Sequence, residues 1–210
     1  MEFKVKILEN PSANNIEIFS MVPDFQQFVR DTSHYGTTGA AARRILAMPA
    51  LKKLRLVKVA LRHFDKALKF QFDLLMNLFL MAETSKIPKR RTIFLHHQIT
   101  DLALSFDQPG LFKIFHEVVS NEFGAEPGLS TLNFKRLTEV LEENKLEFPW
   151  LMAPFNPKGY QMHPSSQACL EILPHLRSKV IADNWNLQGT IPDKEVQVFL
   201  QTHPFAAATV

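Results

Sequence analysis

The chain has 210 residues, 46% of them apolar, and a formal charge of +3 that arises from 24 basic and 21 acidic side chains. A chain of this length and composition can bury one large core, so we expect a single domain over residues 1–210. The densest basic cluster, KIPKRR at residues 86–91, lies between two predicted elements. It is more typical of a solvated loop than of a nucleic-acid-binding surface.

Cys169 is the only cysteine in the chain. One thiol excludes an intramolecular disulfide and a zinc site with several cysteine ligands, and it favours a reducing compartment. The most apolar stretch, residues 70–82, is interrupted by Asp73 and Asn77 and is too short to span a bilayer. Because the N-terminus also lacks the apolar region of a secretory signal, we expect a cytoplasmic protein that contacts no membrane.

Short runs of β-branched and aromatic residues alternate with longer helical patterns along nearly the whole chain, which is typical of a parallel α/β fold. The predicted strands are residues 3–8, 27–31, 55–61, 92–97, 126–130, 148–154, 178–183 and 205–210. The predicted helices are residues 39–53, 62–81, 109–123, 133–145, 165–177 and 192–201. Residues 9–26 should hold the first helix, but their prolines and asparagines predict a short or distorted one.

Strands that alternate with helices in one domain predict the α/β class and, within it, a (β/α)8 TIM barrel, with an open doubly wound sheet as the alternative. No glycine-rich dinucleotide fingerprint or phosphate-binding loop supports that alternative. The last predicted strand ends at Val210. The expected barrel therefore lacks a final helix, as in a truncated chain or a shortened relative.

Polar side chains at the predicted strand ends are the candidates for chemistry, because barrel enzymes carry their catalytic groups there. Asp31 and Tyr35 follow the second predicted strand. Lys58 lies in the third, and His96 ends the fourth. A tyrosine is a poor acid at neutral pH unless an ammonium group stabilises its phenolate, and a carboxylate must hold that ammonium. These side chains together would form a proton-donating site.

Each candidate also has a structural interpretation. Asp31 and Tyr35 could cap and pack a turn, and the stem of Lys58 could extend outward between helices. Only one of His96 and His97 can face the interior of a strand-lined barrel, and that histidine could be a hydrogen-bonded core residue. The sequence has no HxH or HExxH spacing, so we expect no metal site.

The order of five motifs resembles the aldo/keto reductases: DTSHYG, VKVAL, IFLHH, PGLSTLNF and KVIADNWNLQG. The resemblance covers about residues 25–210. It implies an oxidoreductase that reduces a small carbonyl compound with NADPH. Tyr35 would donate the proton, Asp31 and Lys58 would tune it, and His96 would orient the substrate.

The same resemblance implies a cofactor site in the second half of the chain. Ser130 would contact the nicotinamide carboxamide. The other cofactor-binding positions would be Asn133, Asn156, Asp183 and Trp185. Met152 stands where the family usually presents a glutamine. Asp183 stands where it presents an aromatic residue, for which Trp185 is a nearby substitute.

Two further functions remain open from the sequence. A non-catalytic barrel could serve binding or assembly, since a fold does not determine a function. A lyase could use Lys58 as a Schiff-base amine, because burial lowers the pKa of a lysine.

Overall fold

A computed structural model describes residues 2–7, 16–22, 30, 33–35, 43, 46, 50, 92–185, 187 and 189–209, called the described residues below. Two side chains of the predicted proton-donating site, Asp31 and Lys58, lie outside them. So do the predicted strand 55–61, the predicted helix 62–81 and the basic cluster at 86–91.

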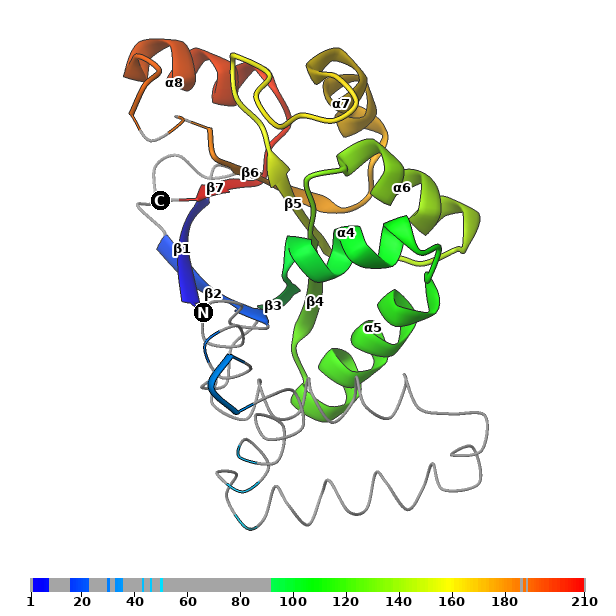
Figure 1. Ribbon diagram of the computed structural model, residues 1–210. Coiled ribbons are helices and arrows are strands. Elements are labelled where there is room, and N and C mark those ends of the chain that lie inside the picture. Colours follow the sequence, from blue (N-terminus) through cyan, green and yellow to red (C-terminus); the bar gives the residue numbers. More distant parts are fainter. Residues whose placement is uncertain are drawn as a thin grey trace.

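The described strands form a ring, seen end-on in Figure 1. Its strands are β1 (Glu2–Ile7), β2 (Ile16–Val22), β3 (Thr92–Leu95), β4 (Glu126–Ser130), β5 (Trp150–Pro154), β6 (Lys179–Asp183) and β7 (Ala207–Thr209). From β2 to β7 each strand pairs in parallel with the next, and this sheet curves into a half barrel. β1 runs antiparallel between its two edge strands, β2 and β7.

The predicted (β/α)8 TIM barrel is therefore wrong. The described residues hold six parallel strands, β2 to β7, and one antiparallel strand. β1 ends at Ile7 and β2 begins at Ile16, with Lys6 paired to Ile16. A parallel crossover needs a dozen or more residues, so this short connection forces the antiparallel pairing.

One local prediction near the N-terminus is also wrong, and another differs from the structure at its one described residue. Within residues 9–26 the sequence IEIFSMV forms β2 rather than a distorted helix, because its branched and aromatic side chains suit a strand. Of the predicted strand 27–31, Arg30 is described and has helical backbone. Residues 33–35, which include Tyr35, are helical as well.

The described helices lie outside the ring of strands (Figure 1). They are α4 (His97–Ser105), α5 (Gly110–Phe123), α6 (Phe134–Glu143), α7 (Ser166–Ile172) with the 3-10 turn η2 (Leu173–His175), and α8 (Asp193–Thr202). The helices predicted at 109–123, 133–145, 165–177 and 192–201 are confirmed within a few residues at each end. The sequence does not predict α4, because its first residue, His97, lies in the predicted strand 92–97. None of the described helices is long and apolar enough to cross a bilayer.

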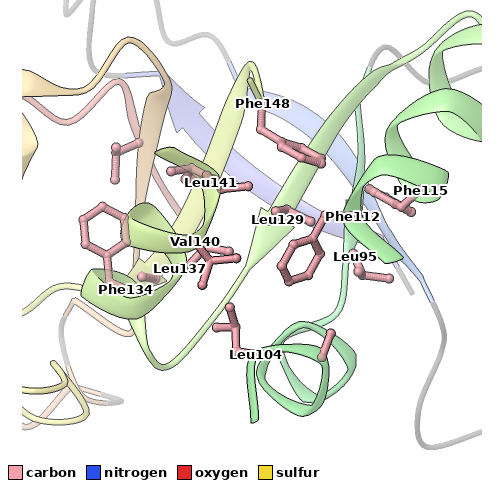
Figure 2. Packing of buried hydrophobic residues seen from close by; sticks show 14 of the residues in the cluster. Leu95, Leu104, Phe112, Phe115, Leu129, Phe134, Leu137, Val140, Leu141 and Phe148 are labelled. Carbon is pink, nitrogen blue, oxygen red and sulfur yellow. The ribbon is translucent and has the colours of Figure 1, made fainter. Parts of the chain in front are cut away.

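The larger core lies between the helices and the outer face of the strands (Figure 2). Phe112 and Phe115 of α5 and Leu137 of α6 are fully buried in one cluster with Leu129 of β4. Phe148, just before β5, extends the same cluster. The apolar stripe that the sequence predicts on 133–145 therefore faces the sheet, as expected of an amphipathic helix.

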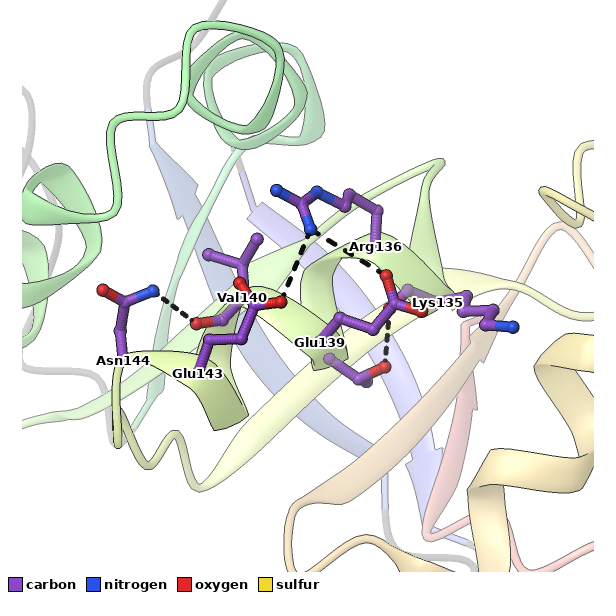
Figure 3. A network of polar contacts seen from close by, with 7 residues as sticks. Lys135, Arg136, Glu139, Val140, Glu143 and Asn144 are labelled. Atoms are coloured by element: carbon purple, nitrogen blue, oxygen red, sulfur yellow. Dashed lines mark hydrogen bonds and ion pairs between the residues drawn. The ribbon is translucent and has the colours of Figure 1, made fainter.

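The polar face of α6 points outward (Figure 3). Arg136 lies 3.9 Å from both Glu139 and Glu143, and these side chains are about half exposed. Such pairs contribute little to stability, because water screens them. Asn144 ends the helix, and its Nδ2 donates to the Val140 carbonyl at 2.8 Å.

A smaller cluster fills the inside of the ring. It contains Phe19, Met21, Phe94, Trp150, Met152, Ile181, Ala206 and Ala207. The inner position of β4 is Gly128, where a Cβ would lie 2.5 Å from the Phe94 ring. The glycine thus makes room for the aromatic ring, and the middle of the ring is a packed core rather than a channel.

Candidate functional site

A pocket of about 510 Å³ opens at the carboxyl ends of the parallel strands. Four of its lining residues, Ser130, Pro154, Asp183 and Thr209, are the last residues of β4, β5, β6 and β7. Strand alternation explains the set, since Met152 and Ile181 lie in the inner cluster two residues before Pro154 and Asp183. The same inward face that fills the ring therefore forms the floor of the pocket.

The pocket has a polar lining with aromatic side chains at its edge. The hydroxyl and amide residues are Ser130, Thr131, Gln161, Asn184 and Thr209, and the aromatic residues are Tyr160 and Trp185. Its imidazole and carboxylate come from His97 and Asp183, and Leu132 and Pro154 complete the lining. No lysine or arginine is among these lining residues within the described part of the chain.

Asp183 presents a carboxylate at the end of β6. Its Oδ1 accepts a hydrogen bond of 2.8 Å from the Thr209 hydroxyl at the end of β7. Its Oδ2 has no hydrogen bond from any described residue. The side chain is half-buried, so one carboxylate oxygen is fixed while the other can contact a bound molecule.

His97 is the first residue of α4 and lies half-buried in the pocket wall. Burial lowers the pKa of its imidazole below the ordinary value of 6.5, while the carboxylates of Asp101 and Asp183 act in the opposite direction. The imidazole is therefore mainly neutral at pH 7 and can accept a proton. His97 and Asp183 therefore place an imidazole and a carboxylate in one pocket, where both can exchange protons with a bound molecule.

Asp101 holds the loop that carries part of the lining. Its carboxylate accepts hydrogen bonds from the Thr131 hydroxyl at 2.5 Å and from the Leu132 N–H at 3.0 Å. The Thr131 oxygen in turn accepts from the Asn133 N–H at 2.8 Å. These bonds tie the connection between β4 and α6 to α4, on which His97 lies.

The predicted role of the histidine pair changes because β3 ends at Leu95. His96 caps α4 instead of ending a strand, and its Nδ1 accepts from the Gln98 N–H at 3.2 Å. Its ring centroid lies 4.2 Å from that of His97, which is the histidine that lines the pocket. The ring of His96 therefore packs against the ring of His97.

Two loops form the opposite rim. Asn156 is buried, and its side chain bonds both the N–H and the carbonyl of Tyr160, at 3.0 and 2.9 Å. The Trp185 indole donates to the Thr209 carbonyl at 2.5 Å. These bonds fix the backbone at Tyr160 and the side chain of Trp185.

The structure brings some of the predicted site residues together and leaves others apart. Ser130, Asp183 and Trp185 line the pocket. Asn133 and Asn156 are not among its lining residues and instead make the loop contacts given above.

Tyr35, the predicted proton donor, is 52% exposed and does not line the pocket. Its ring lies under the Arg43 guanidinium, 4.6 Å away. Its predicted partners Asp31 and Lys58 lie outside the described residues. Its role as a proton donor stays a prediction.

Sequence reasoning missed Tyr160 and Gln161 of the rim. They belong to a loop whose path depends on long-range contacts, and no local pattern marks them. His97 could have been found had the helix start after Leu95 been recognised.

The described residues contain no group of three histidine, cysteine, aspartate or glutamate side chains arranged to hold a metal ion. The resemblance to the aldo/keto reductases rests on short motifs in a matching order and stays a prediction. Comparison of the chain with protein-family models, with curated proteins and with solved structures gave no match.

Proposed function

We propose that this protein is an enzyme that moves a proton on a small, neutral, hydroxylated carbonyl compound. The observation that carries this proposal is that His97 and Asp183 line one pocket at the carboxyl ends of the parallel strands. This end of a parallel α/β sheet is where ligands bind in open sheets and in barrels alike.

The reaction that fits these groups is an isomerisation. The neutral His97 imidazole takes a proton from the carbon next to the carbonyl, and the electron pair of that bond forms an enolate. His97 then delivers the proton to the neighbouring carbon, which was the carbonyl carbon, so no oxidant or reductant is consumed. Asp183 takes the proton of the substrate hydroxyl through its free Oδ2 and passes it to the former carbonyl oxygen, so the carbonyl moves to the neighbouring carbon and the carboxylate is restored.

The lining also limits the substrate. Phosphorylated substrates are usually held by lysine or arginine together with helix N-termini, and of these the described lining provides the first turn of α4 at His97 but no lysine or arginine. A neutral compound with several hydroxyl groups suits the hydroxyl and amide lining.

Solvent deuterium exchange tests this proposal directly. Small aldoses and ketoses are incubated with the protein in D2O, and NMR follows loss of the C–H signal next to the carbonyl. We expect exchange with at least one sugar and its loss in His97→Gln. Gln98→Ala is the control, since Gln98 is exposed beside the site and its side chain is not part of the pocket. Exchange that survives in His97→Gln, or is absent for the whole sugar series, contradicts the proposal.

Carbonyl reduction with NADPH is a second candidate, supported by the lining positions of Ser130, Asp183 and Trp185. The described lining residues provide no lysine or arginine for the cofactor's phosphate groups, so they do not fit that part of the molecule. Titration with NADPH, followed by Trp185 fluorescence, tests this candidate. Quenching that disappears in Trp185→Phe supports it, and no change at millimolar NADPH contradicts it.

A further inference from the structure

We propose that the side-chain amides of Gln161 and Asn184 select substrates that carry two hydroxyl groups on adjacent carbons. The proposal deepens the function above and rests on it. Asn184 Nδ2 donates to Gln161 Oε1 at 3.2 Å, and both residues line the pocket. The bond joins the loop after β5 to the loop after β6 across the pocket rim.

This amide bridge keeps hydrogen-bonding capacity to spare. The Gln161 amide nitrogen and the Asn184 carbonyl oxygen make no hydrogen bond to any described residue. An amide NH2 donates two hydrogen bonds, and an amide oxygen accepts two. The pair therefore presents a donor beside an acceptor, which matches one hydroxyl that accepts and a neighbouring hydroxyl that donates.

Both residues hold a backbone conformation that glycine would adopt more easily. Gln161 has φ of 60° and Asn184 has φ of 51°, in the left-handed region. Asparagine tolerates this region, whereas glutamine has no such preference. Gln161 therefore stands at a position where its backbone is strained, as is common at ligand-binding sites.

The rim is held in place before any ligand arrives. The side chain of Asn156 bonds both backbone groups of Tyr160, the residue before Gln161. Trp185, the residue after Asn184, is tied to β7 through the Thr209 carbonyl. Fixed donors and acceptors lose little entropy when a ligand binds, and the Tyr160 and Trp185 rings can cover the C–H face of a polyol.

The test compares cis-1,2-cyclohexanediol with cis-1,3-cyclohexanediol, which have the same atoms and differ only in hydroxyl spacing. Binding to the full chain is followed by saturation-transfer NMR and by tryptophan fluorescence. We expect the unmodified protein to prefer the 1,2-diol roughly tenfold, about the value of one net hydrogen bond. The preference should fall to within about twofold in both Gln161→Gly and Asn184→Gly, since truncation of either amide removes one such bond.

Leu187→Gly is the matched control. Leu187 also has a positive φ, of 46°, and lies in the loop that carries Asn184, but it does not line the pocket. Each glycine variant thus relaxes the backbone in the same way, and only the amide variants should lose the preference. A thermal unfolding curve for each variant confirms that it is folded.

The outcomes separate this inference from the proposed function. An unmodified protein with no preference for the 1,2-diol overturns the inference, as does a preference that survives in both amide variants. If either of these results is found and His97→Gln still loses deuterium exchange, the proposed acid–base function holds without the diol site. If the amide variants lose the preference while His97→Gln keeps exchange, the diol site stands and the proposed function fails.

Discussion

The two ends of the parallel strands show opposite uses of polar side chains. At the amino ends, the Trp150 indole donates to Glu126 Oε2 at 2.7 Å, and Lys179 Nζ lies 5.2 Å from the indole ring. Trp150 is only 7% exposed, so its ring covers the inner core at the amino ends of the strands. At the carboxyl ends, Asp183, Gln161 and Asn184 keep oxygen or nitrogen atoms that no described residue satisfies.

The difference teaches how one alternation pattern yields both stability and a site. At the amino ends of β4, β5 and β6 the inward side chains of Glu126, Trp150 and Lys179 contact one another, which is the arrangement expected where only packing matters. Inward positions at the carboxyl ends carry groups that are held but not saturated, which is the arrangement a ligand needs. Substitutions at either end should therefore change different measured quantities.

The largest expected effect lies at the carboxyl ends. Asp183→Asn keeps the size of the side chain but removes its charge and basicity, so the deuterium-exchange rate should fall roughly a hundredfold to ten-thousandfold. Asp193→Asn is the control, because Asp193 is exposed in the first turn of α8 and does not line the pocket. Equal exchange rates in the two variants would remove Asp183 from the reaction.

At the amino ends the expected loss is in stability. Trp150→Ala should lower the free energy of unfolding by about 3–5 kcal/mol, because it leaves a cavity in the inner core and an unpaired Glu126. Trp185→Ala, at the pocket, should cost less than half as much because that side chain is partly exposed. Urea denaturation measures both, and a larger loss for Trp185→Ala would contradict the contrast between the two ends.

A smaller change tests the packing between them. Gly128→Ala places a Cβ against the Phe94 ring, so unfolding should become easier by about 1–3 kcal/mol. Gly110→Ala serves as the control, since a Cβ there meets no atom within 4 Å. Thermal unfolding of the pair gives the difference, and equal stabilities would show that the ring moves aside freely.

The smallest effect is a dependence on pH. The pKa of His97 is lowered in the folded state, so the unfolded chain binds a proton first as pH falls below 6.5. As pH falls from 6.5 to the lower folded pKa, His97 therefore lowers the free energy of unfolding. At pH 7.5 it causes no such loss. His97→Gln should make the fall in unfolding free energy from pH 7.5 to 5.5 smaller, as measured by urea denaturation at both values. A steeper fall in the variant would contradict this sign.

The second half of the fold could be predicted because its elements are signalled locally. The apolar spacing of α6 and the glycine at 124 after α5, with φ of 59°, fix helices that tertiary contacts merely reinforce. The run TIFLHH has no such punctuation, so the change from strand to helix after Leu95 was missed. That change depends on His96 acting as a cap, which a histidine rarely does.

The candidate site was only partly accessible to the same reasoning. Ser130 and Asp183 are predicted site residues at strand ends, and both line the pocket. The Gln161 to Asn184 bridge joins residues 23 positions apart through backbone conformations that sequence patterns do not encode. Within the predicted strand 27–31, Arg30 has helical backbone instead, because the apolar residues of that stretch do not distinguish a strand from a helix.

The antiparallel strand β1 links the earliest and the latest parts of the described fold. Lys6 pairs with Ile16 on one side and with Ala208 on the other, so the ring is completed by contacts that span almost the whole chain. Until β7 has been synthesised, the outer edges of β1 and β6 present unpaired N–H and carbonyl groups, to which other strands can add. The protein should therefore be most prone to aggregate during its synthesis, and the closing of the ring should be a late and slow step of folding.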